Sequence, residues 1–150
     1  MPDKIRDLRV RAVCVPMEHP HQTASGAVTE SPLVLTDAVT GEGVTGHSIV
    51  FTYTRAALLP TAELVRNIAP LVEGSPLAPR EVQQTLARRF RLLGTQGLVG
   101  MALAAIDMAL WDALARAHGV SLARLLGGID RKSTRLNSSH IQKSRMPSSA

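Results

Sequence analysis

Three histidines are the side chains in this sequence that most readily suggest a metal site. His19 and His21 lie two residues apart in a polar stretch, and His47 follows further along the chain. Imidazole nitrogens bind zinc and related metals. Such a site also needs fixed geometry, and a hydrogen-bond partner for the second ring nitrogen of each histidine, the one that does not bind the metal. Because no cysteine or carboxylate motif accompanies these histidines, we favour polar loop residues over a metal site and assign no metal ligand.

Two carboxylates and one thiol are the remaining candidates for acid–base or nucleophilic chemistry. Asp107 and Asp112 lie five residues apart in a helical segment, which turns their side chains about 140° from each other, so they do not share a proton. Asp112 and Arg116 have the i, i+4 spacing of a helical ion pair. Cys14 alternates with apolar residues, and we interpret it as a small core residue. We therefore assign no catalytic residue.

The elements that must position these side chains begin with strands. Residues 5–15 alternate between apolar and charged types, which is typical of a strand with one wet face. Residues 33–39 and 44–53 are two further strand-like runs, joined by a turn with two glycines. Phe51 and Tyr53 end the last run, and we expect one to face the core and the other the exit of the sheet.

A polar segment separates the first strand from the second. Residues 17–31 show no sustained helical or strand period and include Pro20 and Gly26. A connection longer than about 12 residues is usually functional or disordered. We predict a long, shaped loop.

Helical periodicity follows the strands. Apolar residues recur at helical spacing from Leu64 to Val72, with Thr61 as a candidate N-cap and Pro70 expected to kink or end the helix. A second apolar stripe starts after Pro79, a favourable first-turn residue, and is closed by Gly94.

The third helical segment has the strongest signal. Residues 98–118 are apolar around most of the helix, as in a helix buried on several sides, and Gly119 is the expected C-cap. A short helical turn follows at residues 122–126. Strands first and helices later predict an α+β fold, in which a three-stranded antiparallel meander is followed by a helical bundle.

Charge divides the chain into two parts. The 150 residues hold 17 Lys+Arg and 12 Asp+Glu, a net charge of +5, yet residues 1–130 hold 12 of each. The excess therefore lies in the Ser-rich end of the chain. We predict a folded domain over residues 1–128 and a disordered tail over residues 129–150.

The basic tail supports an alternative function. A stand-alone binding module whose tail engages nucleic acid is the competing hypothesis, but the tail lacks aromatic side chains for stacking and the domain is electrically neutral. We therefore expect no nucleic-acid partner. The tail also resembles translated sequencing-adapter read-through, and we interpret it as non-native.

Length and cysteine content limit the class of protein. The chain is too short for a complete (β/α)8 barrel of about 250 residues, and no uninterrupted apolar run comes near the roughly 20 residues of a membrane span. The N-terminus lacks the pattern of a secretory leader. A single cysteine, Cys14, fits a reducing compartment. We expect a cytoplasmic domain without a membrane partner.

One segment resembles a known family signature. Residues 102–128, ALAAIDMALWDALARAHGVSLARLLGG, are similar to the signature of the mandelate racemase and muconate lactonizing enzyme group of the enolase superfamily. Upstream, RAVCVP, QTASGAV, PLVL and TGHS follow one another as in the mandelate racemase branch. The resemblance covers roughly residues 5–128. It implies an enolase-like N-terminal capping domain, and that a barrel should follow Gly128.

The resemblance also implies a chemistry. In this group, barrel carboxylates hold Mg²⁺, which stabilises an enediolate while Lys or His bases remove the proton α to a carboxylate. The implied parent is a Mg-dependent racemase or acid-sugar dehydratase, a homo-oligomer that acts on a 2-hydroxy acid or sugar acid. The fragment itself is then expected to be inactive and to hold no cofactor.

The same resemblance points to three substrate-contacting residues. By position they are His21 and Val28 in the segment after the first strand and Tyr53 at the end of the third. Their implied role is substrate contact and exclusion of water. The mandelate racemase branch has an apolar residue at the position of His21. The resemblance is therefore compatible with a substrate that is more polar than an aromatic acid.

Overall fold

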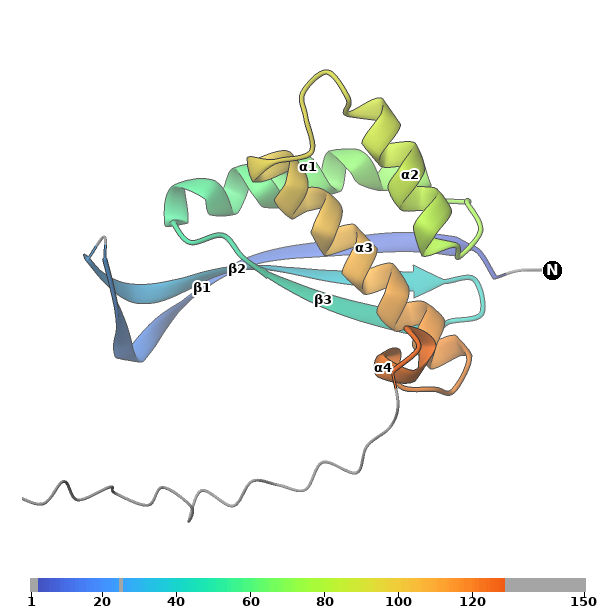
Figure 1. Ribbon diagram of the computed structural model, residues 1–150, viewed down its shortest axis with the longest axis horizontal. Coiled ribbons are helices and arrows are strands. Elements are labelled where there is room, and N and C mark those ends of the chain that lie inside the picture. Colours follow the sequence, from blue (N-terminus) through green and yellow to red (C-terminus); the bar gives the residue numbers. More distant parts are fainter. Residues whose placement is uncertain (1–2, 25, 129–150) are drawn as a thin grey trace, which may run out of the picture.

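The chain folds into one sheet with helices on one of its faces (Figure 1). The computed structural model describes residues 3–24 and 26–128. The strands are β1 (Ile5–Thr23), β2 (Gly26–Thr40) and β3 (Thr45–Phe51), paired antiparallel in the order β1-β2-β3. The predicted meander is confirmed. The predicted tail, residues 129–150, lies outside the described residues.

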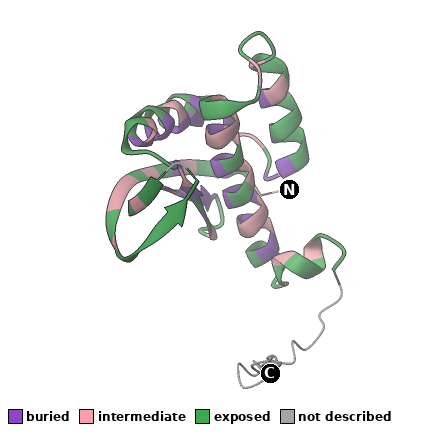
Figure 2. Cartoon of the chain, turned by 60° about the vertical axis from the view of Figure 1, so that its left-hand side comes forward, coloured by how far each residue is buried: buried purple, intermediate pink, exposed green. Residues whose placement is uncertain are grey.

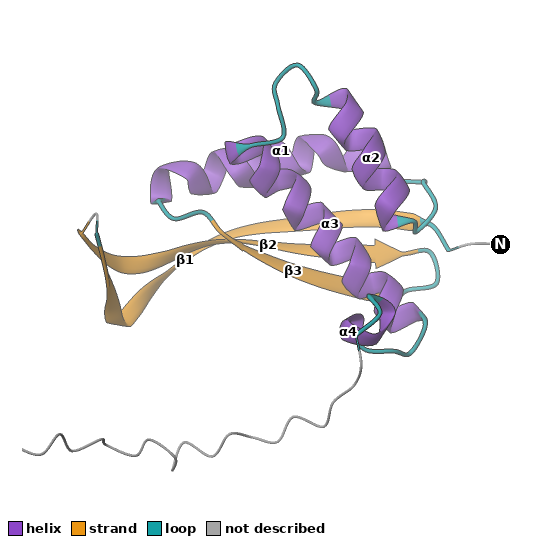
Figure 3. Cartoon of the chain, viewed as in Figure 1, coloured by secondary structure: helices purple, strands orange, loops and turns teal. Residues whose placement is uncertain are grey.

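The helices follow the strands in the chain, as predicted. They are α1 (Arg55–Val72), α2 (Pro79–Arg89), α3 (Gly97–Ala117) and the short α4 (Leu122–Leu125). Figure 3 shows α1 and α3 crossing the same face of the sheet, and α2 contacts α3. The α+β architecture is therefore confirmed.

The hydrophobic core lies between the sheet and the helices. Buried side chains from the strands, such as Val34 and Val50, meet Val65 and Ile68 of α1 and Ile106 of α3. In Figure 2 the purple buried positions line the inner sides of the helices. The opposite face of the sheet has no helix over it among the described residues.

Small residues bring α3 close to β3. The helix turns Ala105, Ala109 and Ala113, all completely buried, towards the sheet. A Cβ atom on Gly46 of β3 would overlap backbone atoms of Ala109 and Ala113. Next along the strand, Ser48 Oγ donates a hydrogen bond of 2.6 Å to the carbonyl of Ala105. The TGHS motif therefore serves helix–strand packing.

By length and composition alone, α3 is long and apolar enough to cross a membrane. Its 21 residues include a window of mean hydropathy 1.7, so the expectation that no segment comes near a spanning length is too strong for this helix. In the fold, α3 contacts β2, β3 and α1, and it buries seven residues. Its composition matches the buried helix that the sequence predicts, and Gly119, with φ 64°, ends it as expected.

The first helix starts earlier than predicted, and it ends at Val72, where the predicted apolar stripe also ends. Thr54 is the N-cap of α1, and its side chain accepts from the backbone N–H of Ala56, whereas Thr61 is buried inside the helix. Pro70 does not end the helix, which continues to Val72. A proline removes one backbone donor, and here the buried face of the helix holds the last turn against the core.

The second helix begins as predicted but ends sooner. Pro79 occupies the first turn of α2, and Val82 and Leu86 are buried. The helix ends at Arg89, and Leu93 is 75% exposed in the following loop. Gly94 has a φ of 80° and closes this loop instead of the helix.

The predicted loop at residues 17–31 is wrong. In the structure β1 and β2 continue beyond the end of β3 as a two-stranded hairpin, which projects from the sheet in Figure 1. The described part of residues 16–31 is called the arm below. Most of its side chains are exposed, so no apolar face produces a period of two, and the register is irregular between Pro16 and His21. The arm is a pair of strands because of its backbone pairing, and not because it buries an apolar face.

Candidate functional site

A hollow at the base of the arm brings together two of the three predicted substrate-contacting residues. Val28 of β2 and Tyr53, just after β3, both line it. Its other lining residues come from the same two chain segments: Ala27, Thr29, Glu30, Pro32, Thr54 and Arg55. The hollow therefore lies between the arm and the start of α1.

His21 lies next to this hollow. It is the cross-strand partner of Val28 in the β1–β2 register, and directly paired residues point to the same face of a sheet. The His21 side chain is exposed and is not among the lining residues. The structure thus places the three predicted residues at one end of the molecule, with Val28 between the other two.

Tyr53 has a strained backbone. Its φ is 61°, in the left-handed region, and it is the non-glycine residue with positive φ in the described part of the chain. This conformation turns the chain from β3 into the N-cap of α1, and a bulky side chain rarely adopts it. Strain of this kind is often found at functional sites.

The expectation that either Phe51 or Tyr53 faces the core is wrong. The two rings contact each other, with centroids 4.9 Å apart, and Tyr53 is 71% exposed. Residues two apart in a strand share a face, and here the intervening Thr52 is the buried one. Both rings therefore lie on the outside of the strand end.

An ion pair borders the hollow. Arg55 Nε lies 3.0 Å from Glu30 Oε1, and Arg55 Nη2 lies 2.6 Å from Glu30 Oε2. The same Nη2 lies 3.6 Å from the Sγ of Cys14. The Arg55 guanidinium holds the pKa of Glu30 below its usual value. The sequence alone does not reveal this pair, because no local spacing links a residue on a strand to one on a later helix.

Two aspartates contact His47. Its Nδ1 lies 2.8 Å from Asp37 Oδ1 on the neighbouring strand, and its backbone N–H donates to Asp112 Oδ2 at 2.8 Å. Asp112 also accepts from Arg116 Nε at 2.7 Å, so the predicted helical ion pair is confirmed. Within residues 3–24 and 26–128, no group of three or more His, Cys, Asp or Glu side chains is placed to hold a metal ion.

Asp107 faces a different direction from Asp112. Burial raises the pKa of the Asp107 carboxyl. A hydrogen bond with Trp111 has the opposite, smaller effect, so the pKa is raised overall. Asp112 is engaged by His47 and Arg116. The two carboxylates have different partners, in line with the helical geometry that separates them.

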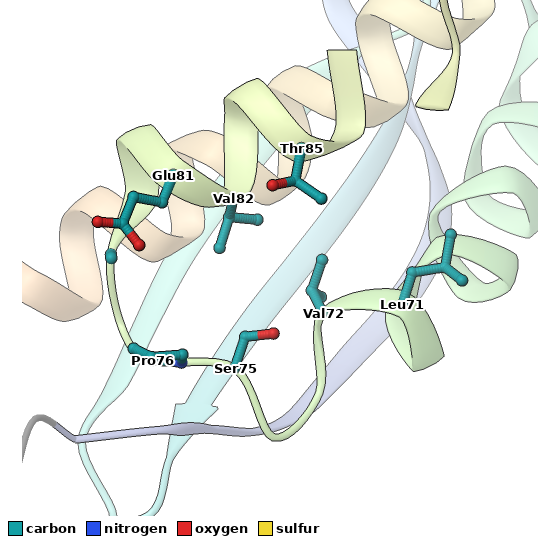
Figure 4. A pocket seen from close by; sticks show the side chains of 8 residues that line it. Leu71, Val72, Ser75, Pro76, Glu81, Val82 and Thr85 are labelled. Atoms are coloured by element: carbon teal, nitrogen blue, oxygen red, sulfur yellow. The ribbon is translucent and has the colours of Figure 1, made fainter. Parts of the chain in front are cut away.

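A second hollow lies between the end of α1 and the start of α2 (Figure 4). Val72, Val82 and Thr85 border it, and its single titratable lining residue is Glu81, in the first turn of α2. One carboxylate beside apolar side chains and hydroxyls offers no acid–base pair. The hollow at the base of the arm is therefore the better candidate site.

Comparison with known families identifies the domain. The family model of the mandelate racemase / muconate lactonizing enzyme N-terminal domain matches residues 5–127. The chain belongs to this family. The match spans β1 to α4, so it includes every strand and helix in the described residues. The resemblance of residues 102–128 to the family signature is confirmed.

Curated relatives of the domain are considerably longer than the chain. Muconate cycloisomerase 1 of Rhodococcus opacus is 32% identical over 127 residues, which cover 79% of this chain and 32% of that protein. D-galactarolactone cycloisomerase of Agrobacterium fabrum is 29% identical over 135 residues, covering 88% of this chain and 34% of that protein. The chain spans about a third of the length of these relatives.

Solved structures show the same fold. An enolase from Bradyrhizobium, complexed with magnesium and mandelic acid, is 45% identical with a TM-score of 0.81, over 87% of this chain and 36% of that one. L-talarate dehydratase from Polaromonas sp., complexed with magnesium and L-glucarate, is 28% identical with a TM-score of 0.75. It covers 83% of this chain and 35% of that one. The domain is thus the N-terminal domain of enolase-superfamily proteins.

Proposed function

We propose that residues 1–128 are the substrate-capping and specificity domain of a mandelate racemase-like enzyme that acts on the α-proton of a 2-hydroxy acid or sugar acid. The observation that carries this proposal is the family match over residues 5–127, in a chain about a third as long as its relatives. The mandelic acid and L-glucarate in two similar structures support the substrate class. On this proposal, residues 129–150 are a non-native tail.

The hollow at the base of the arm supports this role. Val28 and Tyr53 would contact the part of the substrate that lies away from the reacting carbon, and His21 would contact it from the other strand of the arm. Closing such a site excludes water and strengthens the electrostatic interactions inside it. These residues orient substrate and exclude water, and they transfer no proton.

Magnesium does not fit the residues that line this hollow. Mg²⁺ prefers several oxygen ligands, usually carboxylates and water, and the hollow has one carboxylate, Glu30, which is already paired with Arg55. No part of the role proposed for this hollow depends on a bound magnesium ion. On this proposal, the metal and the catalytic bases belong to a barrel, which lies outside the third of the relatives' length that this chain matches. The parent enzyme is then a cytoplasmic homo-oligomer.

The polar residues at and beside the hollow support a polar acid. Glu30 and Arg55 border it as an ion pair, and His21 lies opposite Val28 on the neighbouring strand. A site built to bond hydroxyl groups discriminates strongly against substrates that lack them. A hydroxylated sugar acid therefore fits this end of the domain better than an aromatic 2-hydroxy acid.

Activity of the isolated chain tests the first part of the proposal. The purified 150-residue protein is incubated with Mg²⁺ and either mandelate or L-glucarate, and racemisation and dehydration are followed by polarimetry and product analysis. We expect no turnover above the background without protein. Turnover that depends on this chain would show that it owns catalytic groups and would refute the capping role.

A chimera tests the capping role itself. Residues 5–127 replace the matching N-terminal segment of the Bradyrhizobium enolase, at 45% identity, and both proteins are assayed with mandelate and L-glucarate. If the domain sets specificity, the chimera turns over an acid and its preference shifts towards L-glucarate. Tyr53→Ala and Val28→Ala should then change KM by about tenfold, whereas Glu18→Gln, on an exposed part of the arm, should not. An active chimera with unchanged preference would contradict the specificity role.

A further inference from the structure

Within residues 3–24 and 26–128, no third strand pairs with the arm. β2 pairs with β3 only from Leu33 to Val39, so residues 16–31 depend on pairing between β1 and β2. That pairing is itself irregular between Pro16 and His21. A two-stranded hairpin is only marginally stable in water. The position of the arm therefore needs a contact with the body of the domain.

The ion pair between Arg55 and Glu30 joins the arm to the helical layer. Arg55 is the first residue of α1 and follows the N-cap Thr54, while Glu30 lies at the base of the arm on β2. The two guanidinium nitrogens contact both carboxylate oxygens, at 3.0 and 2.6 Å. A two-point pair of this type fixes relative orientation as well as distance.

The same pair joins the segments that form the hollow. Glu30 lies two residues after Val28, and Arg55 lies two residues after Tyr53. All four residues line the hollow. We infer that Arg55 is a positioning residue, which fastens the arm to the start of α1 through Glu30 and thereby sets the separation of Val28 and Tyr53. This inference holds for the domain whether or not the hollow receives a substrate.

The expected effect is local. An exposed ion pair adds little to global stability, and the Arg55 side chain is 70% exposed. Breaking the pair should therefore increase the opening of the arm without unfolding the core. Amide hydrogen exchange separates these two effects, because it reports opening segment by segment.

Hydrogen exchange of the 150-residue chain tests the inference. Arg55→Gln, Glu30→Gln and the double variant are compared with the unchanged protein at low salt. Amides of residues 16–31 should exchange about threefold faster or more in each single variant, and those of β3 and α3 should not change. The double variant should match the single variants, because both remove one interaction. Arg55→Lys should restore part of the protection.

Arg66→Gln is the matched control. Arg66 also lies on α1 and is paired with Glu63 at 3.1 Å, but its other bond goes to Val10 in the body of the sheet. This variant should leave exchange in the arm unchanged. Methyl resonances of Val28 and ring resonances of Tyr53 should shift in Arg55→Gln and not in Arg66→Gln.

Two results would overturn the inference. In the first, the arm exchanges at the same rate with and without the pair. In the second, all segments accelerate together, which would show that the pair contributes to global stability. Either result leaves the capping proposal intact, because the chimera tests that proposal through substrate preference.

Discussion

Gly46 of β3 lies directly beneath Ala109 of α3, so close that a Cβ atom on the glycine would overlap the alanine's carbonyl oxygen. The backbones of α3 and β3 are therefore in direct contact at this point. The neighbouring hydrogen bond from Ser48 to Ala105, also across the strand–helix contact, shows that the close approach is specific. This contact fixes where the central helix lies on the sheet.

Gly46→Ala should therefore destabilise the domain strongly. Overpacking a rigid contact typically costs about 1–3 kcal/mol, and here the atoms that the added Cβ would overlap belong to the helix backbone. We expect urea unfolding, followed by circular dichroism, to show a loss of about 2 kcal/mol or more. Ile49→Ala, at an exposed position on the same strand, serves as control and should change stability by about 0.5 kcal/mol at most. Equal stability of both variants would contradict this packing.

The left-handed backbone of Tyr53 predicts an order among its variants. Asn tolerates positive φ, whereas a β-branched residue does not. Tyr53→Val should therefore be less stable than Tyr53→Asn by about 1 kcal/mol, although both lose the contact with Phe51. Thermal unfolding of the two variants measures the difference. A more stable valine variant would show that φ at this position is not positive in solution.

Asp107 predicts a pH dependence of stability. Burial raises the pKa of its carboxyl in the folded state above the ordinary value of 3.8. The folded protein then binds this proton more tightly than the unfolded chain, so the contribution is fully present below pH 3.8 and is lost as pH rises through the folded pKa. Asp107→Asn removes the buried charge and keeps an acceptor for Trp111. We expect this variant to gain stability relative to the unchanged protein between acid and neutral pH.

Urea unfolding at a series of pH values checks the sign. The difference in unfolding free energy between Asp107→Asn and the unchanged protein should grow as pH rises and level off above the folded pKa. Ile49→Ala, at an exposed position, removes no titratable group and should show no such growth. A difference that shrinks with rising pH would mean that the charged form of Asp107 is favoured by the fold.

The uncovered face of the sheet predicts self-association of the chain on its own. Val13, Leu33 and Phe51 form one cross-strand row, and Leu35 pairs with Ile49 in the next. These positions alternate with buried ones such as Val34 and Val50, so they point away from the helices. Ile49 is 62% exposed and the other four are partly exposed, and an apolar patch in contact with water favours association.

Analytical ultracentrifugation over a range of concentrations measures this association. We expect the unchanged protein to form larger species as concentration rises, and Ile49→Lys to shift the distribution towards monomer. Leu92→Lys, in the exposed loop after α2, is the control for added charge and should have a smaller effect. A protein that stays monomeric at every concentration would show that this face is stable in water.

Much of the fold follows from local patterns. The period-two alternation of residues 5–15 and the apolar circumference of residues 98–118 each matched the element observed. The arm could not be predicted from such a pattern, because its two strands pair through their backbones and bury no face. The start of α1 was also missed, since Thr54 becomes an N-cap only after Tyr53 turns the chain.

The amino-acid sequence by itself determined the order of the elements, the buried character of α3 and the family, because these depend on apolar periodicity and on a signature contained in one segment. Tertiary structure alone decided that two of the predicted residues share one hollow and that an ion pair borders it. Val28, Tyr53, Glu30 and Arg55 lie on two segments separated along the chain, and they meet because β2 passes the start of α1. The ion pair at the base of the arm is a contact of this kind, since attraction between charges depends on their distance in space and not on their separation in sequence.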